Sequence, residues 1–71
     1  DIELFDLVRH AIELLSPQRR KIFSLKIWGK YSNHEIADKL NLSVNTIKFQ
    51  YSQSLKQIKE IVRKCAISLL M

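Results

Sequence analysis

The sequence predicts an all-α fold: four helices with a helix-turn-helix motif, no wing, and a long C-terminal helix. The 71 residues contain one Gly and one Pro, too few for the turns of a β-fold, and no run alternates as a half-buried strand does. Apolar residues recur instead at spacings of three and four. At this length and 46% hydrophobic content we expect one domain, spanning residues 1–71.

The first two helices are predicted from an apolar stripe and a cap. The first is expected over about residues 2 to 15, where the spacing of apolar side chains is three or four. These are Ile2, Phe5, Val8, Ile12 and Leu15, widened by Leu4, Ala11 and Leu14. Ser16 and Pro17 are the preferred N-cap and first residue of a second helix, and Gly29 is expected to form its C-cap.

A capped helix pair follows between Ser32 and Lys48. Ser32 and Glu35 have the S-x-x-E spacing of a capping box, which predicts a short helix over about 33 to 40. Asn41 tolerates the left-handed backbone of a C-cap, and Ser43 is the N-cap of the next helix. Two helices joined by a three-residue turn form a helix-turn-helix candidate.

The fourth helix meets no helix breaker between Ser43 and the end of the chain. Its apolar stripe consists of Ile47, Tyr51, Leu55, Ile58, Val62, Cys65 and Leu69. A helix-turn-helix needs far fewer residues, so the part after about Ile58 is expected to pack on the first helix or on a partner.

Charge is distributed unevenly around a net value of +5. Residues 1–15 carry four acidic residues and Arg9, a sum of −3, whereas residues 16–71 carry eleven Lys and Arg against three acidic residues, a sum of +8. A basic surface on a small domain fits a nucleic-acid partner, whose phosphates release counterions on binding. A solvated lysine-rich surface gives the same composition.

The polar side of the fourth helix carries the side chains that suit a DNA major groove. Asn and Gln pair with adenine, Lys pairs with guanine, and Phe contacts the thymine methyl group. The candidate DNA-binding residues are Ser43, Asn45, Thr46, Lys48, Phe49, Ser52, Gln53 and Lys56. Phe49 is the most informative of them, because a large aromatic on a polar face indicates contact with DNA or a partner, although single exposed apolar residues are common.

Other classes of function have little support in the sequence. His10 and His34 lie on different predicted helices, and no glycine-rich phosphate loop or metal-ligand spacing occurs, so we expect no enzyme, cofactor or metal. We expect no membrane span, because no run of apolar residues is long enough. The lone Cys65 and the absence of a signal peptide favour the cytoplasm, and the first residue, Asp1, suggests a piece of a longer protein.

Four segments of the chain resemble region 4 of bacterial sigma factors, most closely the extracytoplasmic-function type. The segments are Leu15–Phe23, Trp28–Ala37, Leu42–Lys48 and Ser54–Ile58, and the resemblance extends over about residues 12 to 62. It implies a four-helix domain that binds double-stranded promoter DNA at the minus-35 element. It also implies contact with the β flap of core RNA polymerase and masking of this surface by an anti-sigma protein.

The resemblance aligns Lys48, Phe49, Ser52 and Gln53 with the promoter-reading helix of the family. Many members have Arg near the positions of Gln50 and Gln53, so the family's base preference does not transfer to this chain. A bidentate Gln favours adenine, whereas Arg favours guanine.

Two alternatives remain at this level. The LuxR-type output domain of response regulators shares the Glu-Ile-Ala and Ser-x-x-Thr patterns, but it usually has acidic residues where this chain has Gln18 to Lys21, which favours sigma region 4. An interaction module is the other alternative, because Ile67 and Leu70 lie off the apolar stripe of the fourth helix. An anti-sigma protein or a second copy, forming a homodimer through this helix, would cover them; a frayed terminus would not need a cover.

Overall fold

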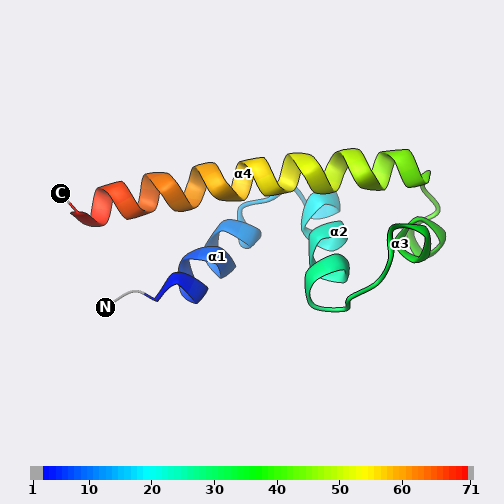
Figure 1. Ribbon diagram of the computed structural model, residues 1–71, viewed down its shortest axis with the longest axis horizontal. Coiled ribbons are helices and arrows are strands. Elements are labelled where there is room, and N and C mark those ends of the chain that lie inside the picture. Colours follow the sequence, from blue (N-terminus) through cyan, green and yellow to red (C-terminus); the bar gives the residue numbers. More distant parts are fainter. Residues whose placement is uncertain (1–2, 71) are drawn as a thin grey trace.

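The chain folds into four α-helices and, over the described part, no strand. The computed structural model describes residues 3–70, with the backbone alone for residues 68–70. The helices are α1 (Leu4–Glu13), α2 (Pro17–Ile27), α3 (Asn33–Leu40) and α4 (Val44–Leu70) (Figure 1). The predicted all-α class and the long C-terminal helix are confirmed.

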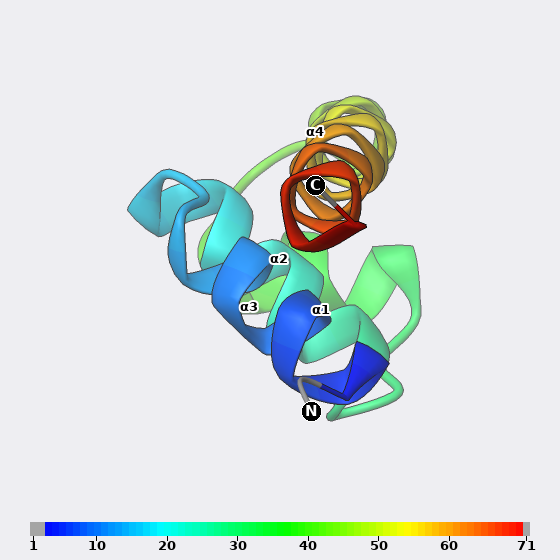
Figure 2. The ribbon, with the colours of Figure 1, turned by 90° about the vertical axis from the view of Figure 1, so that its left-hand side faces the viewer.

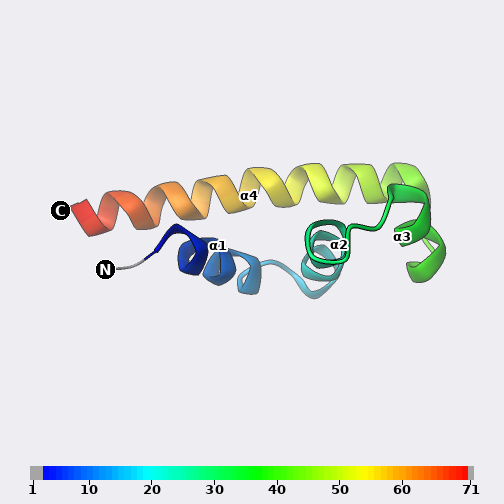
Figure 3. The same cartoon turned by 60° about the horizontal axis from the view of Figure 1, so that its bottom comes forward.

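The long helix α4 forms one side of the molecule, and the three shorter helices pack beneath it. Figure 1 and Figure 3 show α1, α2 and α3 following one another along the same side of α4, and Figure 2, viewed along that helix, shows its other side uncovered. The resulting shape is elongated, with extents of 44 × 18 × 16 Å. A helix of 27 residues spans about 40 Å, so α4 sets the long axis.

The predicted caps of the helix-turn-helix are confirmed. The Ser32 hydroxyl accepts from the Glu35 N–H at 3.1 Å, and the Glu35 carboxylate accepts from the Ser32 N–H at 2.9 Å. Asn41 takes the left-handed conformation with φ 56°, and the Leu42 N–H donates to the Ala37 carbonyl at 3.0 Å. These bonds end α3 with a Schellman motif and leave three residues, 41–43, before α4 begins.

The end of α2 differs from the prediction. Ser16 caps its start as expected, accepting from the Arg19 N–H at 3.4 Å, but the left-handed residue after its end is Lys30 (φ 57°) and not Gly29. Gly29 is needed for a different reason. A Cβ there would lie 2.7 Å from ring carbons of Tyr31 and 2.9 Å from the Leu25 carbonyl oxygen. Any side chain at position 29 would therefore clash with its neighbours.

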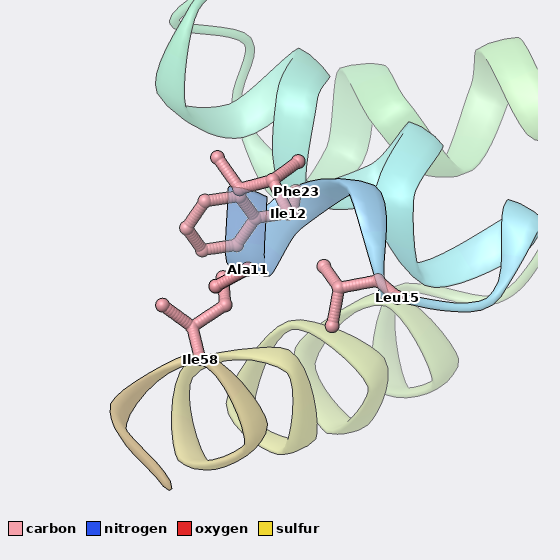
Figure 4. Packing of buried hydrophobic residues seen from close by; sticks show 5 residues of the cluster. All are labelled: Ala11, Ile12, Leu15, Phe23 and Ile58. Atoms are coloured by element: carbon pink, nitrogen blue, oxygen red, sulfur yellow. The ribbon is translucent and has the colours of Figure 1, made fainter. Parts of the chain in front are cut away.

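The interior consists of two hydrophobic clusters arranged along α4. The first joins α1, α2 and α4 through Ala11, Ile12, Leu15, Phe23 and Ile58, drawn in Figure 4. The second joins α2, α3 and α4 through Ile22, Ile36, Ala37 and Ile47. Tyr51 packs against both clusters, and its ring stacks on Phe23 with centroids 5.6 Å apart.

The N-terminal half of α1 departs from the predicted core. Phe5 is 52% exposed, and Leu4 and Leu14 are exposed too, while Ile2 lies outside the described residues. The contact with α4 is made by Val8, Ala11, Ile12 and Leu15, so Leu4 and Phe5 lie before it and Leu14 lies off the face that makes it. The predicted packing of the region after Ile58 on α1 is confirmed, since Ile61 and Val62 join the first cluster.

The described residues of the apolar stripe predicted for α4 are buried or half-buried, and one further residue is buried with them. Ile47 and Ile58 are buried, and Tyr51, Leu55, Val62 and Cys65 are half-buried; the side chain of Leu69 lies outside the described part. The unexpected member is Ser54, which is fully buried and donates its hydroxyl to the Gln50 carbonyl at 2.7 Å. A small side chain at Ser54 lets α4 approach the helices beneath it closely.

Replacing Ser54 tests this close approach. We expect Ser54→Leu to lower the free energy of unfolding by about 1–3 kcal/mol, because the added methylenes overfill a packed site. Ser54→Ala is the matched control and should change it by less than about 1 kcal/mol, since the hydroxyl bonds only to its own helix. Denaturant titration measures both; a Leu variant as stable as the Ala variant would contradict the packing described.

The capping box gives the stability a defined pH dependence. The backbone N–H and hydroxyl of Ser32 lower the pKa of Glu35 below its ordinary value of 4.5. Because the folded pKa is the lower one, this contribution to stability is present above about pH 4.5 and is lost as the pH falls through the folded pKa. We expect Glu35→Gln to flatten the melting temperature against pH in this acid range.

Ser32→Ala separates the stability contributed by the N-cap hydroxyl from that contributed by the ionised Glu35 carboxylate. It should lower the free energy of unfolding by about 1 kcal/mol at every pH, because the N-cap hydroxyl is lost. It should nevertheless keep most of the acid dependence, because the backbone N–H of Ser32 is the larger cause of the shift. Thermal melts across the acid range distinguish the two variants, and identical profiles would refute the assignment.

Candidate nucleic-acid interface

The first half of α4 presents three parallel stripes, each with spacings of four, three and four. The reading stripe, which is exposed at each position, consists of Asn45, Phe49, Ser52 and Lys56. The glutamine stripe beside it, half-buried throughout, consists of Thr46, Gln50, Gln53 and Gln57. The core stripe consists of Ile47, Tyr51, Ser54 and Ile58 and faces the helices beneath. Seven of the eight predicted site residues therefore lie on one side of α4 or at its borders, and Ser43 lies at its start.

The N-terminal end of α4 is fixed by two hydroxyl groups. The Ser43 hydroxyl accepts from the Thr46 N–H at 3.0 Å and lies 2.8 Å from the Thr46 hydroxyl. Ser43 is thus the N-cap that the sequence predicted, and Thr46 is held against it. The positive end of the helix dipole lies here, next to the exposed side chain of Asn45, in a position that favours an anion.

Phe49 projects from the middle of the reading stripe. Its side chain is 58% exposed, as expected from the sequence, and it belongs to neither hydrophobic cluster. A phenyl ring left largely in water gains little from folding. Phe49 therefore offers apolar area to whatever binds this face.

Two lysines accompany this stripe. Lys48 stands on the border away from the glutamine stripe, and Lys56 ends the reading stripe; both are exposed. The ion pairs of residues 3–70 are those of Glu60 with Arg63 (2.7 Å) and Lys64 (3.9 Å), farther along α4. Within this part of the chain, no carboxylate neutralises the two ammonium groups beside Phe49.

The attachment of the glutamine stripe to α2 was not evident from the sequence. The Arg19 guanidinium donates from Nε to Gln50 Oε1 at 2.8 Å and from Nη1 to Gln57 Oε1 at 3.2 Å. Arg19 is therefore not part of a free basic face on α2. Gln50 differs from the sequence expectation as well, because Arg19 holds its oxygen toward α2, whereas a bidentate pair with adenine needs the oxygen and the NH₂ group to face the base together. Gln53 makes no side-chain hydrogen bond within residues 3–70 and keeps both amide groups available.

A lysine of α2 contacts the short helix α3. Lys26 donates to Asn33 Oδ1 at 2.7 Å, and its ammonium lies 5.4 Å from the centre of the Tyr51 ring. Lys26 of α2 thus contacts both the first turn of α3 and the core stripe of α4. No sequence signal indicated this contact, because Lys26 occurs at an apolar-face position of α2.

No second chemical site appears in residues 3–70. His, Cys, Asp and Glu side chains do not gather in groups that could hold a metal ion in this part of the chain. None of its helices has the length and apolarity needed to cross a membrane. The shifted carboxyl groups are Glu35, in the capping box, and Glu60, whose pKa is lowered by its hydrogen bond from Arg63; both contacts are structural.

Comparison with known proteins agrees with this geometry. The family model described as "Sigma-70, region 4" matches residues 5–58, from α1 through the three stripes of α4. No curated protein and no solved structure gives a significant match. Region 4 of sigma-70 factors is a non-catalytic domain that binds the minus-35 element of promoters and core RNA polymerase in transcription initiation. Since the match spans about three quarters of the chain and includes the whole helix-turn-helix, the chain belongs to the sigma-70 region 4 family.

Proposed function

We propose that residues 1–71 form region 4 of an extracytoplasmic-function sigma factor and that the reading stripe enters the major groove of the minus-35 element. The carrying observation is the uncovered side of α4, where an exposed polar stripe begins at a well-formed N-cap. The stripe rises about 16 Å from Asn45 to Lys56, three turns of helix. A major groove about 12 Å wide and 8.5 Å deep accepts one helix along such a length.

Each residue type has a role in this proposal. Asn45 and Gln53 have free amide groups that suit adenine edges, and Phe49 suits a thymine methyl group. Ser52 is exposed between them and can bond to a base or a phosphate. Base recognition in this proposal thus comes from the reading stripe and from Gln53 beside it.

Phosphate contacts come from the ends and borders of the same surface. Ser43 and Thr46 lie at the helix N-terminus, where the dipole attracts a phosphate. Lys48 and Lys56 add unpaired positive charge. The net charge of +5 increases the rate and strength of association with DNA at low salt.

The assignment to the extracytoplasmic-function type is supported by the sequence. The four segments that resemble extracytoplasmic-function members support that type over the LuxR-type domain, and we propose the cytoplasm as the location. The β flap of core RNA polymerase is the proposed contact within the enzyme. An anti-sigma protein or a second copy remains a prediction for the end of α4, supported by the 48% exposure of Ile67; the side chain of Leu70 lies outside the described part.

Salt dependence tests the phosphate contacts. We expect the affinity for a minus-35 duplex to fall steeply as salt increases, and Lys48→Ala to reduce the slope of log affinity against log salt by about 1. Arg9→Ala removes a charge from α1, away from the reading stripe, and should leave the slope unchanged. Binding that does not depend on salt, or equal slopes for Lys48→Ala and the parent chain, would contradict the proposal.

Base discrimination tests the reading face. Gln53→Ala and Phe49→Ala should each lower the preference for cognate over scrambled duplex by about 1–3 kcal/mol, because each removes a contact to a base edge. Ile67→Ala is the matched control for Phe49, since both are exposed apolar residues on α4, and should preserve discrimination. If Phe49→Ala discriminates as well as the parent chain, Phe49 is an incidental surface residue.

A further inference from the structure

We propose that Arg19, on α2, is a positioning residue for base recognition that acts through Gln50. This inference rests on the proposed function, because it requires α4 to read DNA. It gives the Gln50 amide a fixed orientation, with its oxygen toward α2, and makes α2 a determinant of which base is preferred there.

The geometry ties one guanidinium to two glutamines two turns apart on α4. Arg19 Nε donates to Gln50 Oε1 at 2.8 Å, and Nη1 donates to Gln57 Oε1 at 3.2 Å. Both bonds are partly buried, which shields them from competing water. The guanidinium is thus held at two points, and its bond to Gln57 restrains the orientation from which it donates to Gln50.

The position of α2 makes this contact possible. Arg19 lies in the first turn of α2, and Figure 1 shows that this end of α2 is the part nearest to α4. Ser54, four residues after Gln50 and three before Gln57, is fully buried and small. A larger side chain at Ser54 would overfill this buried position and push the helices apart.

The bond determines what Gln50 can offer to DNA. An arginine side chain only donates, so the amide oxygen of Gln50 must face it and the NH₂ group must point elsewhere. Recognition of adenine by Gln needs the oxygen and the NH₂ group together. With its oxygen turned toward Arg19, Gln50 presents mainly its NH₂ group to DNA, which suits base edges that accept without a paired donor, namely guanine N7 and O6 and thymine O4.

The neighbouring glutamine supplies the contrast. Gln53 lies one turn farther along the same stripe and has no bond to Arg19, so its amide can pair with adenine in the bidentate manner. Two identical side chains on one stripe therefore have different base preferences. The difference comes from α2 and cannot be found in the sequence of α4.

The experiment is selection of a randomised minus-35 duplex library by the 71-residue chain and its variants, followed by sequencing. Arg19→Met should free the Gln50 oxygen and enrich adenine about fivefold or more at one base position, the equivalent of at least about 1 kcal/mol of discrimination. Arg20→Met is the matched control. Arg20 is exposed and donates to the Glu13 carbonyl at 3.5 Å, away from the glutamine stripe, so the selected sequences should keep the parent preference.

Two further variants separate positioning from general stability or charge. Arg19→Lys keeps the charge but cannot hold both glutamines with a planar fork, so it should shift the base preference in the same direction as Arg19→Met. In a Gln50→Met background, Arg19→Met should change nothing at that base, because the residue through which it acts is gone. Thermal melting identifies any variant that fails to fold, and Arg19→Lys then carries the comparison.

The outcomes distinguish failure of the positioning role of Arg19 from failure of the proposed DNA-binding function. If the parent chain selects no sequence at all, the proposed reading face fails and the inference fails with it. If the parent chain selects a sequence and Arg19→Met or Arg19→Lys selects the same one with altered affinity only, the proposed function stands and the positioning role is refuted. An equal shift by Arg19→Met with and without Gln50 also refutes it.

Discussion

The packing of three short helices against one side of α4 is the constraint on which the rest of the structure depends. The core stripe of α4 belongs to both hydrophobic clusters, with Ile58 in the first and Ile47 in the second. Tyr51 contacts both, stacks on Phe23 and receives the Lys26 ammonium over its ring. Because α4 is held from beneath at this point, the rotation of the helix about its own axis is fixed, and so is the side that faces solvent.

The arrangement of two clusters in series makes α2 the connecting element. Its neighbouring residues Ile22 and Phe23 enter different clusters, one with α3 and one with α1. The helix-turn-helix pair is thus stabilised by the second cluster, while the first cluster holds α1 and the later turns of α4. A domain of 71 residues has little stability to spare, so a loss in either cluster affects the orientation of α4.

Features fixed by local chemistry could be predicted from the sequence, and features fixed by helix crossings could not. The capping box of Ser32 and Glu35, the left-handed Asn41 and the Ser43 N-cap involve residues within a few positions of one another, so their spacing is sufficient. The exposure of Phe5 depends on how α1 crosses α4, and the burial of Ser54 depends on how closely α2 approaches. A sequence pattern of apolar residues at spacings of three and four determines neither the crossing angle nor the distance between two helices.

The candidate site shows the same division. Helical periodicity alone placed the reading stripe, because opposite sides of one helix follow from the position of its apolar residues. The Arg19 bonds join residues 31 and 38 positions apart, so no local spacing in the sequence indicates them. A short polar side chain or an arginine has no preferred partner until the fold supplies one.

The contact between α2 and the glutamine stripe therefore changes how recognition by this family member should be understood. If α4 alone determined the base preference, the residues of its reading stripe would carry that preference into any related domain. Gln50 is oriented by Arg19, a side chain that belongs to α2. In the proposed reading face, base selection would therefore include Arg19 on α2, which does not need to touch DNA itself.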